Sequence, residues 1–152
     1  MAKRKQAKNK QISWQNKVKL DKEYEQLGTF SKSQLAAIRK HYKIPENAKR
    51  IRANISNTIK HNKQHLGQIE HYLEELGLTK EQYIRFIASN FNQIRRGKID
   101  KTVVLAFCGE DLDHVAAVHL VFDMNENYWM VKSVRASRKQ FFEEDDLIWE
   151  KK

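Results

Sequence analysis

Three apolar stretches with a period of two decide the fold: 102-TVVLAF-107, 115-VAAVHLVFDM-124 and 128-YWMVKSVR-135. Alternate residues of a strand point to opposite faces of a sheet, and β-branched residues are enriched in strands, so each stretch is predicted to be a β-strand. Residues 125-NEN-127 form a short turn between the last two stretches, which predicts an antiparallel hairpin. The C-terminal part of the chain is therefore expected to form a small antiparallel sheet.

Helical signals fill the chain before Gly97. Ser31 and Thr79 are each followed three residues later by Gln, which is the capping-box pattern that begins a helix. In the range 46–63, isoleucines recur every four residues on an otherwise polar surface, at Ile51, Ile55 and Ile59. The sequence therefore predicts an α+β fold, in which a helical N-terminal half is followed by a small antiparallel β-sheet of three to four strands.

The charge of the chain points to a polyanionic partner. Among its 152 residues, 29 Lys and Arg stand against 19 Asp and Glu, giving a net charge of +10. Such an excess favours nucleic acid first and an anionic membrane second. The single cysteine, Cys108, excludes an internal disulfide, and no stretch is long and apolar enough to span a bilayer. We expect a cytoplasmic protein that does not associate with membranes.

The first residues are basic and almost without apolar side chains. Residues 1–12 are predicted to be a disordered basic arm, followed by a helical basic region over 13–66 and an α+β domain over 67–152. The arm is expected to contact phosphates without base selectivity through Lys3, Arg4, Lys5, Lys8 and Lys10.

Metal and cofactor patterns are weak. His61 and His65 have the i, i+4 spacing that can place two imidazoles on one helix face, but no glutamate stands between them as in the zinc-protease pattern. Neither a P-loop nor a Gly-rich dinucleotide-binding turn occurs in the sequence. We expect no metal site and no cofactor.

The stretch 128–135 and the residues after it form a candidate phosphate site. Alternation predicts one face shared by Trp129, Val131, Ser133 and Arg135. Hydroxyl and guanidinium groups at a strand end suit a phosphate, because Arg offers two parallel donors to phosphoryl oxygens. Arg138 and Lys139 add further positive charge there. The alternative is that these residues are simply exposed at the edge of the sheet.

Four segments carry a family resemblance: 67-GQIEHYLEELGLT-79, 102-TVVLAF-107, 128-YWMVKSVRAS-137 and 141-FFEEDDLIWE-150. Their order resembles the phage-associated and polymorphic-toxin branch of the barnase–EndoU–colicin–RelE nuclease superfamily. The resemblance implies a nuclease-like domain over 67–152. It also implies a metal-independent endoribonuclease of the toxin or phage-effector type, often acting on tRNA. In that reaction the RNA 2′-hydroxyl attacks the adjacent phosphate and leaves a cyclic phosphate.

The same resemblance implies a catalytic set of His71, Ser133 and Arg135. His71 would act as the base or position it, Ser133 would donate to the phosphate, and Arg135 and Arg138 would hold that phosphate. Trp129 would stack on a neighbouring RNA base. The sequence departs from the family at one point, because Glu70 stands where a Lys would precede the histidine.

His119 is the rival base. Its apolar neighbours, Ala117 and Val121, favour a histidine on a sheet face over a catalytic one. We expect RNA as the main partner, with tRNA among the candidates, and an acidic immunity or antitoxin protein as a second partner. Two alternatives explain the charge equally well: a non-catalytic RNA- or DNA-binding protein, and an interaction module for an acidic partner protein. Whether the catalytic set lies in one cleft distinguishes the enzyme from both.

Overall fold

The computed structural model describes residues 24–109, 114–138 and 146–151. Its strands are β1 (Glu25–Thr29), β2 (Arg50–Ala53), β3 (Gln93–Arg96), β4 (Thr102–Cys108), β5 (His114–Asp123), β6 (Tyr128–Arg138) and β7 (Leu147–Glu150). The described helices are α2 (Lys32–Arg39), α3 (Ile55–His61), α4 (Lys63–Gln68), α5 (Glu70–Leu76) and α6 (Lys80–Asn90). The basic arm expected over residues 1–12 lies outside the described ranges.

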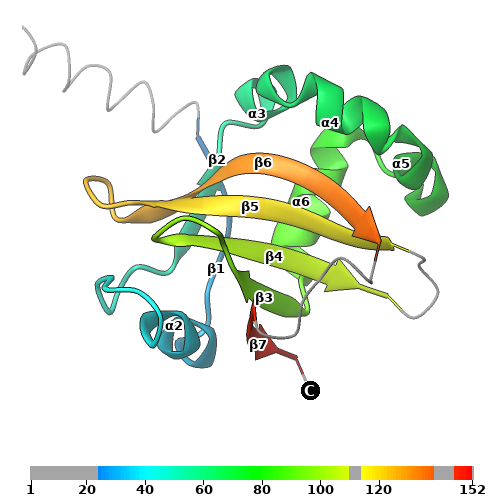
Figure 1. Ribbon diagram of the computed structural model, residues 1–152. Helices are drawn as coiled ribbons and strands as arrows, with labels where there is room; N and C mark the ends of the chain where they lie inside the picture. The colour runs from blue at the N-terminus through cyan, green and yellow to red at the C-terminus, as the bar shows by residue number, and fades with distance from the viewer. Residues whose placement is uncertain (1–23, 110–113, 139–145, 152) are drawn as a thin grey trace, which may run out of the picture.

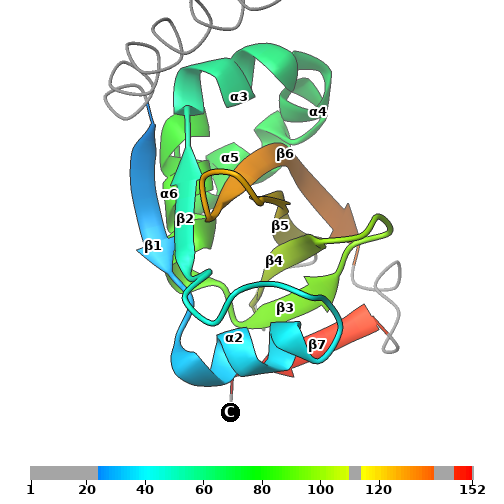
Figure 2. The same cartoon turned by 90° about the vertical axis from the view of Figure 1, so that its left-hand side faces the viewer.

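All of these strands belong to one seven-stranded sheet with the order β1-β2-β6-β5-β4-β3-β7. Neighbouring strands are antiparallel, except that β2 runs parallel to β6. The sheet is strongly curved. Helix α2 lies next to the edge strand β7, and α3 and α4 lie beside β6 on the opposite side of the molecule (Figure 2). Helix α6 lies behind the central strands in Figure 1.

This architecture shows that the predicted fold was wrong. The sheet has more than the three to four strands expected, and it is mixed instead of antiparallel. The N-terminal half is not a helical unit, because it supplies β1 and β2. Strands from both sides of the boundary expected at residues 66 and 67 share the sheet, and that boundary falls within α4.

The range 46–63 shows why the periodicity misled. Ile51 lies in β2, opposite Trp129 of β6, whereas α3 begins only at Ile55. Between them Asn54 caps the helix, because its side chain accepts a hydrogen bond from the backbone N–H of Asn57 at 3.1 Å. The spacing of four therefore spans the end of a strand and the start of a helix.

Local signals were more reliable. The capping boxes that begin α2 at Ser31 and α6 at Thr79 are confirmed. The antiparallel pairing of β5 with β6 across the turn at residues 125–127 is confirmed as well.

One hydrophobic core joins the helices to a single face of the sheet. From α6 it takes Tyr83, Ile84 and Ile87, all fully buried. From β5 it takes every second residue: Ala116, Val118, Leu120 and Phe122. From β4 it takes Val103 and Leu105. The residues that alternate with these core residues on β4 and β5 face the other side of the sheet, which we call the open face.

Candidate nucleic-acid interface

The pairing of β5 with β6 contains a β-bulge that decides which side chains of β6 reach the open face. His119 lies opposite Ser133, whereas the next residue, Leu120, lies opposite Val131. Lys132 is therefore an extra residue in β6. An extra residue shifts the side-chain alternation by one position, because strands have a period of two.

The bulge separates residues that were expected to share a face. Trp129 is fully buried in the core, while Ser133 and Arg135 lie on the open face. Asn62, between α3 and α4, fixes the bulge, because its Nδ2 donates to the backbone carbonyl of Lys132 at 3.3 Å. The prediction of one shared face was therefore wrong, since simple alternation does not reveal an inserted residue.

A groove of about 440 Å³ crosses the open face over β3, β4, β5 and β6. Five basic side chains line it, namely Arg95, Arg96, Lys98, Lys132 and Arg135. Asp146 is the single carboxylate among its described lining residues. This excess of positive charge in a concave surface attracts polyanions, and phosphates in particular.

The basic groups stand on two sides of an apolar floor. Arg95 and Arg96 come from β3, Arg135 comes from β6, and Val104 and Ala117 lie on the strands between. Neighbouring strands are about 4.8 Å apart, so β3 and β6 are separated by roughly 14 Å. One phosphate cannot touch both sides across that distance, and the groove therefore suits a chain with successive phosphates.

On the β3 side, the arginines differ in how firmly they are held. Arg95 is only 8% exposed, and its Nε donates to Oε1 of Gln93 at 3.0 Å. Arg96 is half exposed and lies 4.0 Å from Asp146, a distance at which an exposed ion pair contributes little. The guanidinium group of Arg95 is therefore held in position as a hydrogen-bond donor. Arg96 can replace its ion pair with Asp146 by one with a phosphate at small cost in free energy.

The turn between β3 and β4 forms one rim of the groove and is tightly braced. The N–H of Gly97 donates to the carbonyl of Thr102 at 2.9 Å, and a Cβ on Gly97 would lie 1.9 Å from Oγ1 of Thr102. Tyr42 donates its hydroxyl to the same carbonyl at 2.9 Å, and burial raises the pKa of Tyr42, so it keeps its proton. Lys98 and Ile99 are thereby presented at the rim on a fixed backbone.

On the β6 side, a buried side chain of α6 holds the backbone of β6 at Arg135. Tyr83 donates its hydroxyl to the carbonyl of Arg135 at 2.9 Å. Burial raises the pKa of Tyr83 far above its ordinary value, which keeps this donor protonated. The side chain of Arg135 is exposed on the open face.

His119 and Ser133 lie on the floor between the two basic sides. They are cross-strand partners in the β5–β6 pairing, and the Cβ atoms of such partners are about 5 Å apart. Both side chains are half-buried and line the groove. An imidazole thus lies beside a hydroxyl donor and among cations.

The structure does not bring His71 to this groove. His71 is exposed on α5 and contacts the ring of Tyr72, with 5.6 Å between the ring centroids. Of the predicted catalytic set, only Ser133 and Arg135 line the groove, together with the rival base His119.

Among the other residues predicted to contact RNA, Trp129 lies in the core. Trp129 donates its Nε1–H to the carbonyl of Ala48 at 2.8 Å and is 0% exposed, so it is a core residue and cannot stack on an RNA base. Arg138 is the last residue of β6. The residues Lys3, Arg4, Lys5, Lys8, Lys10 and Lys139 lie outside the described ranges.

Sequence reasoning missed the basic residues of the β3 side. Arg95, Arg96 and Lys98 form a short basic run around Gly97, where the last helix was predicted to end, whereas the structure ends α6 at Asn90 and places Arg95 and Arg96 in β3. That run was a usable signal, because it precedes the first clear strand of the sheet. Lys132 was also missed, since its place in the groove depends on the bulge.

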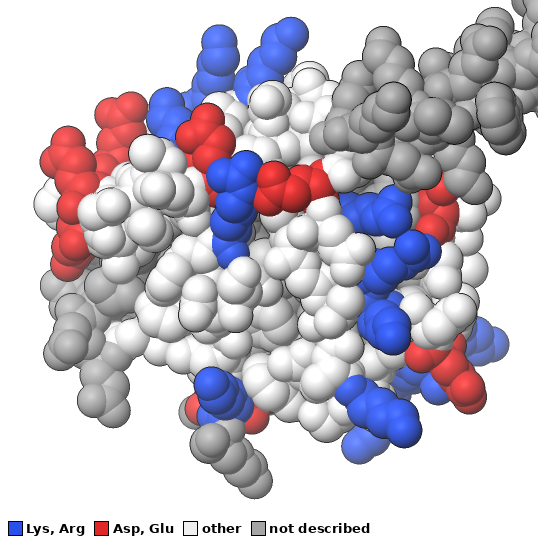
Figure 3. Space-filling model, turned by 180° about the vertical axis from the view of Figure 1, so that it is seen from behind, with Lys and Arg blue, Asp and Glu red and all other residues white. Residues whose placement is uncertain are grey.

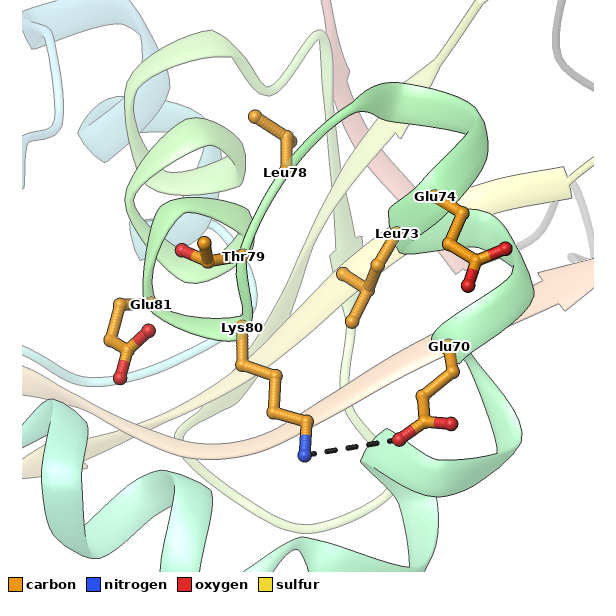
Figure 4. Close-up of a pocket in the computed structure, with 7 residues that line it drawn as sticks. All are labelled: Glu70, Leu73, Glu74, Leu78, Thr79, Lys80 and Glu81. Atoms are coloured by element: carbon orange, nitrogen blue, oxygen red, sulfur yellow. Dashed lines mark ion pairs between the residues drawn. The ribbon is translucent and has the colours of Figure 1, made fainter.

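A second hollow, of about 370 Å³, lies between α5 and the start of α6 (Figure 4). Three glutamates line it, and Glu70 is 4.0 Å from Lys80 in an exposed ion pair. A hollow with this charge repels phosphates. Seen from behind, on the side of α6, the molecule carries basic and acidic side chains interspersed (Figure 3).

Two further findings concern metals and membranes. Within residues 24–109, 114–138 and 146–151, no three His, Cys, Asp or Glu side chains form a group that could hold a metal ion. No helix in this part of the chain has both the length and the apolar character needed to cross a bilayer.

Comparisons of the chain with protein-family models, with curated proteins and with solved structures give no match. The functional inference therefore depends on the chemistry of the groove itself.

Proposed function

We propose that this protein binds RNA in the groove across β3–β6 and cleaves it through the 2′-hydroxyl of the RNA. One observation supports the proposal above all: five Lys and Arg side chains surround a cross-strand pair of His119 and Ser133. The reaction is the one that the nuclease resemblance implies. The proton-transferring group is His119, in place of His71.

The proposed reaction begins when the imidazole of His119 accepts the proton of the 2′-hydroxyl. The 2′-oxygen forms a bond to the adjacent phosphorus, and the bond from phosphorus to the 5′-oxygen breaks. A 2′,3′-cyclic phosphate remains on one fragment. The departing 5′-oxygen takes up a proton from solvent, and His119 returns its own proton to solvent. The step needs no oxidant, reductant or co-reactant.

The groups around His119 would stabilise the transition state. Extra negative charge develops on the non-bridging oxygens while phosphorus has five ligands. Arg135, on the same strand as Ser133, offers guanidinium donors to those oxygens, while Arg95 on the β3 side would hold a neighbouring phosphate of the chain. The hydroxyl of Ser133 can donate to the same phosphate from beside His119. Roughly a hundredfold in rate is the usual loss when one such donor is removed.

The test is cleavage of labelled RNA, tRNA included, by the full chain in EDTA, followed by identification of the fragment ends. We expect cyclic phosphate ends, and no cleavage where a 2′-deoxynucleotide replaces the attacking residue. His119→Ala should abolish cleavage, whereas the matched control His71→Ala should cleave at the wild-type rate.

Other outcomes would overturn the proposal. RNA that binds but stays intact would make the protein a non-catalytic binder. A rate that His71→Ala abolishes and His119→Ala spares would place the site on α5 instead of in the groove.

A further inference from the structure

Two large hydrophobic side chains are markedly exposed among the described residues, and only one of them belongs to the groove. Ile99 is 63% exposed and lines the rim at the β3–β4 turn. Met124 is 55% exposed and lies on the β5–β6 turn, outside the lining of the groove. A single exposed apolar side chain is common on protein surfaces. Ile99 differs from such a residue because it lies at the rim of a basic groove.

The backbone holds Ile99 in place. Its carbonyl accepts a hydrogen bond from Oγ1 of Thr102 at 2.6 Å. Tyr42 and Gly97 fix the same turn from below through the carbonyl and amide groups described above. Ile99 is therefore presented in one position, and a ligand that touches it does not have to order the turn first.

The neighbours of Ile99 define what that ligand must look like. Arg96 and Lys98 flank it with positive charge, and Val104 continues the apolar surface onto the floor. A ligand that fits has phosphates next to a flat apolar group. An unpaired nucleotide has both, because its base face is free to lie on an apolar side chain. A duplex hides its base faces and presents two charged backbones.

We infer that the groove takes unpaired RNA and that Ile99 contacts a base. This rests on the proposed function and specifies its substrate class. The basic side chains then supply affinity that depends on salt, whereas Ile99 supplies affinity that does not. The contact reads no particular base, because every base has an apolar face.

The experiment measures binding, so that it does not depend on cleavage. The probe is a fully 2′-O-methylated RNA oligonucleotide, used single-stranded or annealed to its complement, over a series of salt concentrations. Ile99→Ala should weaken single-strand binding about fivefold, since part of an isoleucine side chain leaves the contact. The slope of log Kd against log salt should stay unchanged, and duplex binding should not change.

Two variants serve as controls. Met124→Ala removes the other exposed hydrophobic and should change neither probe's affinity. Arg135→Gln should weaken both probes and lower the salt slope by about one phosphate contact.

The outcomes separate the inference from the proposed function. Equal effects of Ile99→Ala on both probes, equal effects of Ile99→Ala and Met124→Ala, or tighter binding of the duplex would overturn the inference. The proposed function survives those results if Arg135→Gln lowers the slope. A wild-type protein that binds neither probe would overturn both, and would favour an acidic protein as the partner.

Discussion

Asn62 is the residue on which the geometry of the groove depends most. It is 4% exposed, and its Nδ2 donates to the carbonyls of Thr58 at 2.7 Å and of Lys132 at 3.3 Å. The second bond ties the bulged residue of β6 to the helices. Because the bulge turns Ser133 and Arg135 toward the groove, Asn62 acts as a positioning residue for both.

Asn62→Ala should lower the free energy of unfolding by about 1–3 kcal/mol, because the carbonyls of Thr58 and Lys132 lose a donor in a buried and a part-buried hydrogen bond. Urea denaturation measures this loss. Asn57→Ala, an exposed asparagine of α3, is the control and should stay within about 0.5 kcal/mol of the wild type.

A positioning role has a second readout. In the absence of urea, and at a temperature at which Asn62→Ala is fully folded, the kcat of this variant for RNA cleavage should fall by a larger factor than its KM rises. An unchanged kcat in the folded variant would make Asn62 a purely structural residue.

At the level of residues, the sequence indicates which chemical groups β6 carries but not to which face of the sheet each side chain points. Ser133 and Arg135 were predicted to bind phosphate because hydroxyl and guanidinium groups suit phosphates, and the structure places both in the groove. Trp129 was misplaced, because the bulge at Lys132 moves it to the opposite face from Ser133. This bulge depends on the pairing of β6 with β5 and on Asn62, which is far away in the sequence.

The β3–β4 turn is the element that presents the rim of the groove, and two glycines test it. A Cβ at Gly97 would collide with Thr102, whereas a Cβ at Gly67, in α4, would meet nothing within 4 Å. Gly97→Ala should therefore destabilise the protein and weaken RNA binding. Gly67→Ala should raise the free energy of unfolding by about 0.5–1 kcal/mol, since alanine favours a helix over glycine.

Thermal unfolding and RNA binding, measured on both variants, check this prediction. A Gly97→Ala protein with wild-type Tm and wild-type affinity would show that the turn tolerates a side chain. A lower Tm for Gly67→Ala would contradict the open space beside α4.

At the level of elements, signals within one segment succeeded and pairing between segments failed. The capping boxes of α2 and α6 need only residues three positions apart, and both were recognised. The strand β2 has only four residues, RIRA, and pairs in parallel with β6 across more than half of the chain. No local pattern announces such a strand, because its partner alone stabilises it.

The whole molecule should lose stability in alkali, because buried tyrosines keep their protons. Burial raises the pKa of Tyr128 to about 12, with Tyr24, Asp123 and Glu126 contributing and Arg52 opposing. Unfolded tyrosines ionise near pH 10. The stabilising contribution of protonated Tyr128 is therefore complete below about pH 10 and is lost as the pH rises to about 12.

Denaturant titrations from pH 8 to 12 measure this loss. Tyr128→Phe keeps the ring that Arg52 contacts at 5.2 Å, so the cation–π interaction remains. The variant should lose less stability than the wild type between about pH 10 and 12. Parallel curves for the two proteins would show that Tyr128 does not couple folding to pH.

At the level of the molecule, the net charge predicts a polyanionic ligand but not the place where it would bind. The excess of 29 basic over 19 acidic residues was visible from the start. The part of this charge that lines the groove comes from β3, β6 and the turn after β3, which the strand order of the sheet brings to one open face. Neither the strand order nor the curvature follows from composition.

The central claim is that RNA binds across β3–β6, and amide NMR tests it most directly. Uncleavable 2′-O-methylated RNA is added to the isotope-labelled protein, and the changes in backbone amide shifts are mapped. We predict that they cluster at Arg95–Lys98, at His119 and at Lys132–Arg135, and that the amides of α5 around His71 stay unchanged. Changes centred on α5, or none along β3 and β6, would contradict the account.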